Sequence, residues 1–462
     1  MSDILSKTLS KVIQWCEPSS SEIKKVNTIA ENTKALISRY NSPKIEGIVF
    51  GGSFAKGTWL KDDADIDIFV KIAASTSYQE FEELGKQIGF ESLRKYKPRI
   101  RYSSHPYVEA FVRRIRVNVV PCYNVEKGKW KSAADRSPFH TQYIKDNLDE
   151  DKKKQVRLLK KFLKGIGVYG AEIATSGFSG YVTEVLILKF GSFKSVLETI
   201  SNMKGVWGQE KKEVISIEKV DQDIIRTFNS HLIIVDPIDA RRNLGAAISA
   251  ESIGRFVLGA RAFLERPSLY FFMKSKTNRK EVKYLYKRLY PNLLVIEFSY
   301  SKRSPDVIWG QLKKSLNALS KQLMIADFKV IRTACSTDEK NLAAFVFLLE
   351  SLELWPYRER IGPEVFRRNA TTSFISKNRK ETVFMWIDDE MKIRILVKRK
   401  ETFAKNYLNL MLSEDIESSG VTLGLKSDIR QSVQIYTGAQ RRIKGIAKDA
   451  VDKIFAKDLI VS

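Results

Sequence analysis

The sequence predicts a multidomain α+β protein: a mixed sheet with helices at the N-terminal end, an all-α middle domain and a C-terminal α/β part. Two observations lead to this fold class. The chain has 462 residues, and at about 150 residues per domain it holds two to four domains. The spacing of its apolar residues changes near residue 150 and again near residue 270. We therefore expect domains at 1–148, 149–268 and 269–462.

The first part alternates helices and strands. Ser19 with Glu22 matches a capping box, and a helical stripe follows as far as Ile37. A glycine-rich turn at 51–60 joins two apolar runs. The expected strands are 45–50, 64–72, 107–112 and 114–123, with a helix at 77–90. Together they predict a small mixed sheet with helices on one side.

The remaining parts differ in periodicity. Positions 156, 159, 162 and 163 form a helical stripe, and a second helix begins after the cap Ser249 and ends before Pro267. A very basic link at 274–288 follows. Beyond it we expect strands at 293–298, 327–336 and 343–352, a helix from Pro305, a hairpin across 383–398 and a basic amphipathic helix at 440–459.

The net charge of +25 indicates a polyanionic partner, with nucleic acid as the first choice and a merely solvated surface as the alternative. No apolar stretch approaches the roughly 20 residues of a membrane span, and the first residues lack the apolar core of a signal peptide. We expect a cytoplasmic protein. Cys16, Cys122 and Cys335 are far apart and predict neither a disulfide framework nor a metal site.

Two carboxylates follow the glycine-rich turn closely in the sequence. Asp65 and Asp67 point to the same side of a strand because side chains alternate there. Two adjacent carboxylates call for a cation, and a hard divalent ion such as Mg²⁺ would bring a substrate phosphate with it. Gly52 allows close backbone approach to a phosphate, Ser53 can donate hydrogen bonds, and Lys56 adds a positive charge. An exposed sheet edge would be the plain alternative.

These residues carry a family resemblance. The string GGSFAKGTWLKDDADIDIFV resembles the archaeal (class I) CCA-adding enzymes, which are tRNA nucleotidyltransferases of the DNA polymerase β superfamily. The strings HPYVEAFVRRIRVNVVPCYNV, GFSGYVTEVLI and VDPIDARRNLGAAIS resemble the same family, in the same order. The resemblance implies a nucleotidyltransferase head, a helical substrate-binding domain and a C-terminal tRNA-binding part. It also implies CTP and ATP as substrates, tRNA as acceptor and two Mg²⁺ ions, while the oligomeric state stays open, a homodimer included.

The resemblance also implies roles for single residues. Asp65, Asp67 and position 118 would be catalytic metal ligands, and the nucleotide would meet Gly52, Ser53, Lys56, His140, Lys160, Tyr169 and Arg242. From His140 onward, each candidate residue could instead have a purely structural role. His140 could be a cap or core histidine, Lys160 a solvated lysine and Tyr169 a packing aromatic. Arg242 could be half of an ion pair with Asp236 or Asp239, and Glu184 could orient pocket groups or form an interior salt bridge.

Position 118 departs from the family pattern. The family places a third carboxylate on the neighbouring strand, where this chain has Asn118. An amide oxygen can ligate a metal weakly but cannot accept a proton from an attacking hydroxyl, and general base catalysis is worth about 10²–10⁴-fold. Glu109 is near in sequence, yet the sequence gives no argument that it substitutes. The chain could therefore be impaired.

Three functions follow, in order of preference. The first is addition of C, C and A to the 3′ end of tRNA without a template, releasing pyrophosphate. The second is another polymerase of the superfamily, such as a poly(A) polymerase or oligoadenylate synthetase, which would give a homopolymer. The third is a catalytically silent RNA-binding relative, which Asn118 favours.

Overall fold

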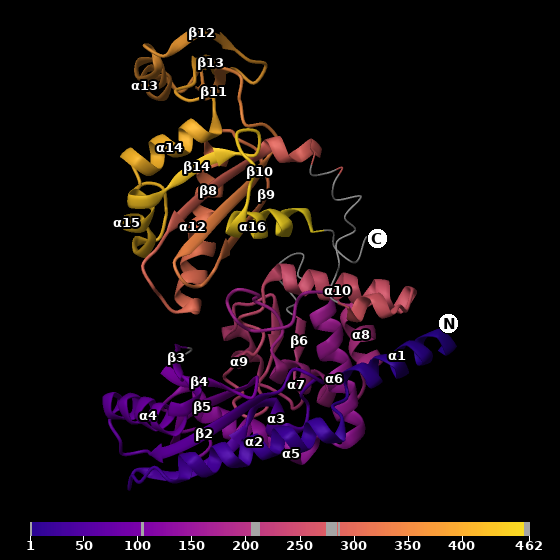
Figure 1. Cartoon of the computed structure of the whole chain (residues 1–462). Helices are drawn as coiled ribbons and strands as arrows, with labels where there is room; N and C mark the ends of the chain where they lie inside the picture. The colour runs from indigo at the N-terminus through magenta and orange to yellow at the C-terminus, as the bar shows by residue number, and fades with distance from the viewer. Residues whose placement is uncertain (1, 103–105, 205–212, 274–283, 285–286, 457–462) are drawn as a thin grey trace. The chain divides into compact units, whose positions relative to one another are not determined.

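The computed structural model describes residues 2–102, 106–204, 213–273, 284 and 287–456 (Figure 1). The chain divides into two compact units, residues 1–276 with 457–462 and residues 277–456. Most of the predicted basic link at 274–288 lies outside the described residues. None of the described helices is long and apolar enough to cross a lipid bilayer.

The first unit is built on a five-stranded mixed sheet in the order β1-β2-β5-β4-β3. Strands β2 and β5 run parallel, and the other neighbours are antiparallel. The strands are β1 (Ile45–Gly51), β2 (Asp65–Ala73), β3 (Arg99–Tyr102), β4 (Pro106–Val112) and β5 (Ile115–Asn124). Four of them confirm predicted strands; β3, only four residues long and alternating between charged and apolar residues, was missed.

Two helices cover one face of this sheet. Apolar residues of α2 (Ser20–Ser38) and α4 (Tyr78–Ser92) share a core with the inward residues of β2, β4 and β5, such as Ile66 and Ile68. Burying that face leaves Asp65 and Asp67 on the other one. Ser19 caps α2 as predicted, but Glu22 accepts from the backbone N–H of Asp62 at 2.8 Å. The capping box is therefore only half formed.

The following region is mainly helical, as predicted, with one short parallel pair of strands in addition. Apolar residues of α1, α5, α6, α7, α8 and α10 form a single core. The remaining helices and strands of the first unit are α1 (Ser2–Cys16), α3 (Gly52–Lys56), α5 (Arg136–Asn147), α6 (Glu150–Gly165), α7 (Gly180–Phe190), α8 (Phe193–Ser201), β6 (Glu213–Ile215), α9 (Gln222–Thr227), β7 (Leu232–Ile234) and α10 (Ala250–Glu265).

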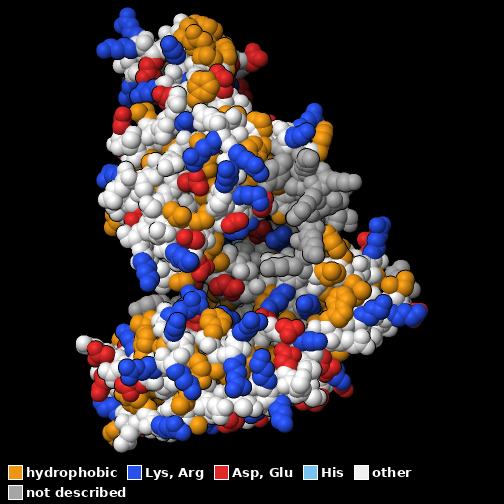
Figure 2. Space-filling view, viewed as in Figure 1, with side chains coloured by type: hydrophobic (Ala, Val, Ile, Leu, Met, Phe, Trp, Pro, Cys, Tyr) orange, Lys and Arg blue, Asp and Glu red, His pale blue; other side chains and the backbone are white. Residues whose placement is uncertain are grey.

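The second unit holds two antiparallel sheets, in the orders β14-β8-β10-β9 and β11-β13-β12. The predicted hairpin is β12 with β13, and β12 exposes its apolar side chains (Figure 2). The C-terminal helix is shorter than predicted among the described residues. The elements are β8 (Leu293–Ser299), α12 (Pro305–Ile325), β9 (Val330–Thr337), β10 (Leu342–Leu349), β11 (Tyr357–Glu364), α13 (Arg368–Asn378), β12 (Thr382–Ile387), β13 (Lys392–Lys398), α14 (Ala404–Glu414), α15 (Leu423–Ser432), β14 (Gln434–Thr437) and α16 (Gly445–Phe455).

Candidate active site

The open face of the sheet carries a group of side chains that we call the strand cluster: Asp65, Asp67, Arg116 and Asn118. The parallel register of β2 and β5 pairs Asp65 with Arg116 and Asp67 with Asn118. Arg116 donates from Nε to Asp65 Oδ1 at 2.8 Å and from Nη2 to the second oxygen. Asn118 donates from Nδ2 to Asp67 Oδ1 at 2.8 Å. The predicted pairing of the two aspartates on one face is therefore present.

Asp67 is enclosed from two sides. Burial raises its pKa, and the hydrogen bond from Asn118 only partly offsets this. Gly52, with φ +64°, begins α3 directly beside it, and a Cβ at position 52 would lie 1.9 Å from Asp67 Oδ2. Only glycine combines that backbone angle with such a close approach. The glycine of the turn thus leaves room for one oxygen of Asp67.

Asn118 lies beside Asp67 on the open face of the sheet and carries no charge. Its side chain is buried, with a residue exposure of 9%, and its Oδ1 accepts no hydrogen bond. Its neighbour on β4 is Glu109, whose carboxylate already accepts from Arg99 at 2.6 Å and Arg101 at 3.3 Å. Within the described residues, no three His, Cys, Asp or Glu side chains are arranged to hold a metal.

The donors still suit a divalent cation. The two carboxylates and the buried amide oxygen of Asn118 are oxygen ligands, which hard cations such as Mg²⁺ prefer. A buried polar atom without a partner costs about 1–3 kcal/mol, so an oxygen ligand role would also satisfy Asn118 Oδ1. The cation would compete with Arg116 for Asp65.

A second group, the helix cluster, joins Lys56, Thr58, Lys160 and Glu184 from α3, the turn after it, α6 and α7. Lys56 donates to Glu184 Oε2, and Thr58 Oγ1 donates to Glu184 Oε1 at 2.5 Å. Lys160 Nζ lies 2.9 Å from Thr58 Oγ1 and 3.4 Å from Glu184 Oε1. Glu184 is fully buried, so the predicted alternative of an interior salt bridge is what the structure shows.

The buried charges of the helix cluster shift one another's pKa values. Burial works to raise the pKa of Glu184, but Lys56 and Lys160 outweigh it and hold that pKa below its usual value. Burial lowers the pKa of Lys160 to about 8 in spite of Glu184. The two lysines and the one carboxylate leave a net positive charge beside the cavity. Lys160 is buried, so it is not the solvated lysine of the alternative interpretation.

Asp236 organises a third group. It accepts from Tyr181 at 3.2 Å and from the N–H of Ile238 at 3.0 Å, and it lies 2.9 Å from His140 Nε2. Arg242 Nη1 donates to the same carboxylate at 3.0 Å, so the predicted ion-pair alternative for Arg242 is present. Tyr181 stacks on His140 with the ring centroids 4.1 Å apart. Burial lowers the pKa of His140, which favours the neutral imidazole.

One cavity of about 290 Å³ brings most of these residues together. Asn118 and Arg242 do not line it. Asn118 bonds to the lining residue Asp67, and Arg242 bonds to Asp236, which in turn bonds to the lining residues His140 and Tyr181. Sequence reasoning missed Tyr181 and Thr58; Tyr181 could have been found, because it precedes Glu184 by three residues on the same helix. The lining residues are Gly52, Ser53, Lys56, Asp65, Asp67, Phe69, Ser137, His140, Thr141, Lys160, Tyr169, Gly180, Tyr181 and Glu184.

Family models match three consecutive stretches of the chain. Residues 31–148 match a nucleotidyltransferase domain, residues 154–273 the second domain of tRNA nucleotidyltransferase, and residues 291–438 the C-terminal domain of CCA-adding enzyme. The boundaries predicted after 148 and 268 remain a prediction.

Curated relatives align over most of the chain. A CCA-adding enzyme of Saccharolobus shibatae is 36% identical over 373 residues, 79% of this chain and 85% of that protein. CCA-adding enzymes of Sulfurisphaera tokodaii and Pyrobaculum neutrophilum are 35% and 34% identical and cover 85% and 83% of this chain and 88% of their own lengths. Among solved structures, a cytoplasmic RNA terminal U-transferase aligns with a TM-score of 0.46 at 15% identity, over 60% of this chain and 99% of that chain.

Proposed function

This chain belongs to the CCA-adding enzyme family, and we propose that it adds C, C and A to the 3′ end of tRNA without a nucleic-acid template. The observation that carries the proposal is the strand cluster behind Gly52, set in a chain that aligns with these relatives over about four fifths of its length. In the reaction, the 3′-hydroxyl oxygen of tRNA bonds to the α-phosphorus of CTP or ATP. The bond from that phosphorus to the β-phosphate oxygen breaks, and pyrophosphate leaves.

We propose that Asp65 and Asp67, with the amide oxygen of Asn118, hold two Mg²⁺ ions. When bound, such ions lower the pKa of the attacking hydroxyl and neutralise charge on the triphosphate. The chain contributes the fixed positions: β2 holds the aspartates in register with β5, and α3 places Gly52 against Asp67. Asp65 would share its oxygens between Arg116 and a cation.

The triphosphate would lie against the start of α3 and the helix cluster. Ser53 lines the cavity next to Gly52, and the net positive charge of Lys56, Lys160 and Glu184 faces the same space. Because every polar group of the helix cluster is bonded, the lysines are fixed before the substrate arrives, and such preorganisation is how charged groups contribute most to catalysis.

The base and sugar would meet the aromatic side of the cavity. We propose that His140 and Tyr169 form its walls, both of which line the cavity. Burial raises the pKa of Tyr169 above its usual value, which keeps the phenol protonated as a hydrogen-bond donor. Arg242 is held by Asp236 and 43% of its side chain remains exposed, so its other N–H groups can reach a base edge.

The acceptor RNA would be held by its phosphates and its A-form shape rather than by sequence. Lysine and arginine side chains spread over the visible faces of both units (Figure 2), in a chain of net charge +25.

Affinity for tRNA should then fall steeply with salt, by roughly 0.7–0.9 in log K per log salt for each neutralised phosphate. Filter binding at several salt concentrations measures this slope, and a flat dependence would mean that the charge serves another purpose. A tRNA substrate also supports a cytoplasmic location.

The test of the activity is the product. A tRNA that ends at the position before C-C-A is incubated with CTP, ATP and Mg²⁺, and the new 3′ ends are sequenced. Ends of C-C-A support the proposal, whereas a homopolymer would identify a poly(A) polymerase or oligoadenylate synthetase instead. Asn118 favours one further candidate, a silent RNA-binding relative, which would bind tRNA and extend it neither as it stands nor with aspartate at position 118.

A further inference from the structure

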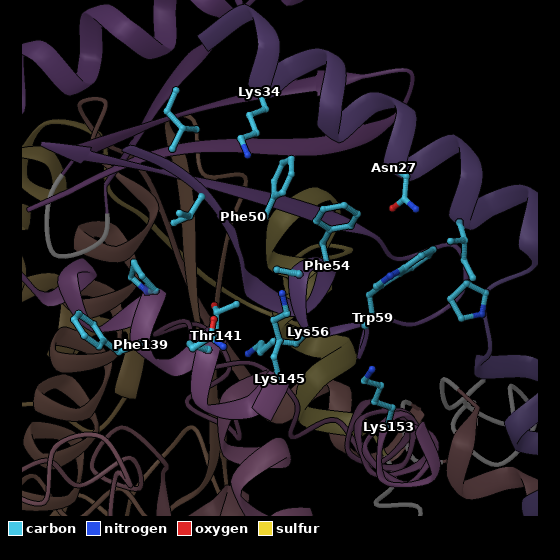
Figure 3. Close-up of a pocket in the computed structure, with 18 of the residues that line it drawn as sticks. Asn27, Lys34, Phe50, Phe54, Lys56, Trp59, Phe139, Thr141, Lys145 and Lys153 are labelled. Atoms are coloured by element: carbon cyan, nitrogen blue, oxygen red, sulfur yellow. The ribbon is translucent and has the colours of Figure 1, made fainter. Parts of the chain in front are cut away.

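A second cavity, of about 870 Å³, lies beside the candidate active site in the first unit (Figure 3). Helix α3 contributes to both: Gly52 and Ser53 line the smaller cavity, Phe54 and Ala55 line the larger one, and Lys56 lines both. Neither Asp65 nor Asp67 lines the larger cavity. Whatever occupies it is therefore not in contact with the proposed catalytic carboxylates.

Aromatic rings form much of this second cavity. Phe50 of β1 and Phe54 of α3 meet edge to face with their centroids 5.3 Å apart. Trp59 and Phe139 add two further rings, and Figure 3 shows Phe50, Phe54 and Trp59 side by side along it. Planar rings at the wall of a cavity this size offer stacking faces to a flat ligand, because bases stack on aromatic side chains irrespective of sequence.

The same cavity is strongly cationic. Its lining holds five lysines and Arg157, against the single carboxylate of Glu150. Three of these cations are already engaged: Lys153 with Glu150 at 2.7 Å, Arg157 with the carbonyl oxygen of Gly57 at 2.6 Å, and Lys56 with Glu184.

The other three lysines have no such partner. In the described parts of the chain, Lys34, Lys71 and Lys145 have no carboxylate within ion-pair distance. Lys34 instead lies over the ring of Phe50, with Nζ 5.1 Å from its centroid. These lysines stand on three different elements, α2, β2 and α5, around one space. Convergent, unmatched positive charge of this kind predicts an anionic ligand.

We propose that this second cavity binds a nucleotide, with its base against the aromatic rings and its phosphates at Lys71 and Lys145. An inorganic polyanion would leave the rings unused, and an uncharged aromatic would leave the lysines unmatched. The side-chain amide of Asn27, which points into the cavity from α2 in Figure 3, can both donate to and accept from a base edge. The nucleotide is either free in solution or part of an RNA strand. This site goes beyond the proposed function and does not depend on it.

The test compares two double variants of the full-length chain with the same change in charge. Lys71→Glu with Lys145→Glu alters the cavity, whereas Lys11→Glu with Lys189→Glu alters exposed lysines outside it. Equilibrium dialysis with labelled ATP and Mg²⁺ counts the bound nucleotides per chain in the absence of tRNA. We expect the wild type and the control to bind one nucleotide more than the cavity variant, which means two against one when the candidate active site also binds ATP. Because charged hydrogen bonds are lost at two lysines, the affinity of the second cavity for ATP should fall by roughly 10²-fold.

Further measurements separate the two sources and the role of the rings. In one outcome, all three proteins bind the same number of ATP molecules, one each, while the cavity variant binds tRNA at least tenfold more weakly than the control. That result would support a nucleotide within a bound RNA strand. Inorganic tripolyphosphate should compete at least about fivefold more weakly than ATP or an RNA strand, because stacking adds to binding. If the cavity variant matches the control in both assays, the proposal is wrong.

Two safeguards keep the result interpretable. Thermal unfolding checks that both double variants fold, and Lys71→Gln with Lys145→Gln repeats the test with half the change in charge. With tRNA at saturating concentration, addition of CMP and AMP should stay within about twofold of the control, since these lysines lie outside the catalytic cavity. An inactive wild type would refute the proposed function while leaving the binding count as a valid test of the second site.

Discussion

The helix cluster and the strand cluster border the same cavity, but only one of them has all its buried polar groups satisfied. In the helix cluster, Glu184 is fully buried and bonds to Lys56, Thr58 and Lys160. In the strand cluster, Asn118 Oδ1 is buried with no hydrogen-bond partner, and burial raises the pKa of Asp67. The helix cluster is therefore satisfied within the protein. The strand cluster instead has a buried acceptor that a bound ligand would satisfy.

This difference suggests a division of labour. A matched buried ion pair fixes positions, because removing one partner leaves an uncompensated charge. An incomplete group of oxygen atoms instead gains from a cation. We therefore infer that the helix cluster positions the substrate while the strand cluster supports the chemistry. Changes to each should affect different measurements, and the following predictions run from the largest expected effect to the smallest.

Removal of either aspartate should stop the reaction. Asp65→Ala or Asp67→Ala should lower CMP incorporation into tRNA by roughly 10³-fold or more, since metal-supplied charge stabilisation is worth several kcal/mol. The matched control is Asp63→Ala, whose exposed carboxylate pairs with Lys164. Near-normal turnover in either variant would remove these aspartates from the mechanism.

Breaking the helix cluster should instead destabilise the first unit. Glu184→Gln keeps the size of the side chain but leaves Lys56 and Lys160 buried without a carboxylate. A broken buried pair costs about 3–5 kcal/mol, which urea unfolding would measure. Glu198→Gln, at an exposed pair with Lys194, should cost no more than about 1 kcal/mol. Equal stability of the two variants would contradict the view that Glu184 stabilises the two buried lysines.

Completing the strand cluster should speed the reaction. Asn118→Asp adds charge at nearly the same shape, so kcat should rise by about 10²-fold or more while KM changes little. The affinity for Mn²⁺, measured without substrates, should rise as well. Asn124→Asp, at the end of the same strand, introduces the same charge and should do neither. Equal kcat in Asn118→Asp and the parent chain would mean that residue 118 is not at the metal or that another carboxylate replaces it.

The buried amine of Lys160 should make stability depend on pH. Burial lowers its pKa to about 8, while the unfolded chain keeps a value of about 10.4. Between these values the unfolded state binds more protons, so this residue's contribution to stability rises with pH, by at most about 1.4 kcal/mol per pH unit. Lys160→Met should lack that rise when urea unfolding is compared from pH 8 to 10. If the free energy of unfolding of the variant rises equally with pH, another group causes the effect.

The smallest expected effect concerns nucleotide choice. Arg242→Ala should change the use of CTP and ATP relative to GTP and UTP by about tenfold, because a base-reading hydrogen bond is worth one to a few kcal/mol. The adjacent Arg241, which is exposed, provides the control. An equal loss with all four nucleotides would indicate a phosphate contact instead.

The sequence predicted the strand cluster better than the helix cluster, and the reason is physical. Strand alternation places Asp65 and Asp67 on one face whatever surrounds them. The partners of Glu184 and His140 are separated from them by 128 and 96 residues, and no local rule brings Lys56 to Glu184 or Asp236 to His140. The short strand β3 and the half-exposed β11 were missed because β3 has only four residues and β11 has few apolar ones.

The most direct test of the central claim is a single comparison of 3′ ends. The Asn118→Asp variant and the parent chain are each given tRNA lacking its last three nucleotides, CTP, ATP and Mg²⁺, and the products are sequenced over time. The account predicts C-C-A ends from both proteins, formed about 10²-fold faster by the variant. Ends other than C-C-A, or no extension even with aspartate at position 118, would contradict it.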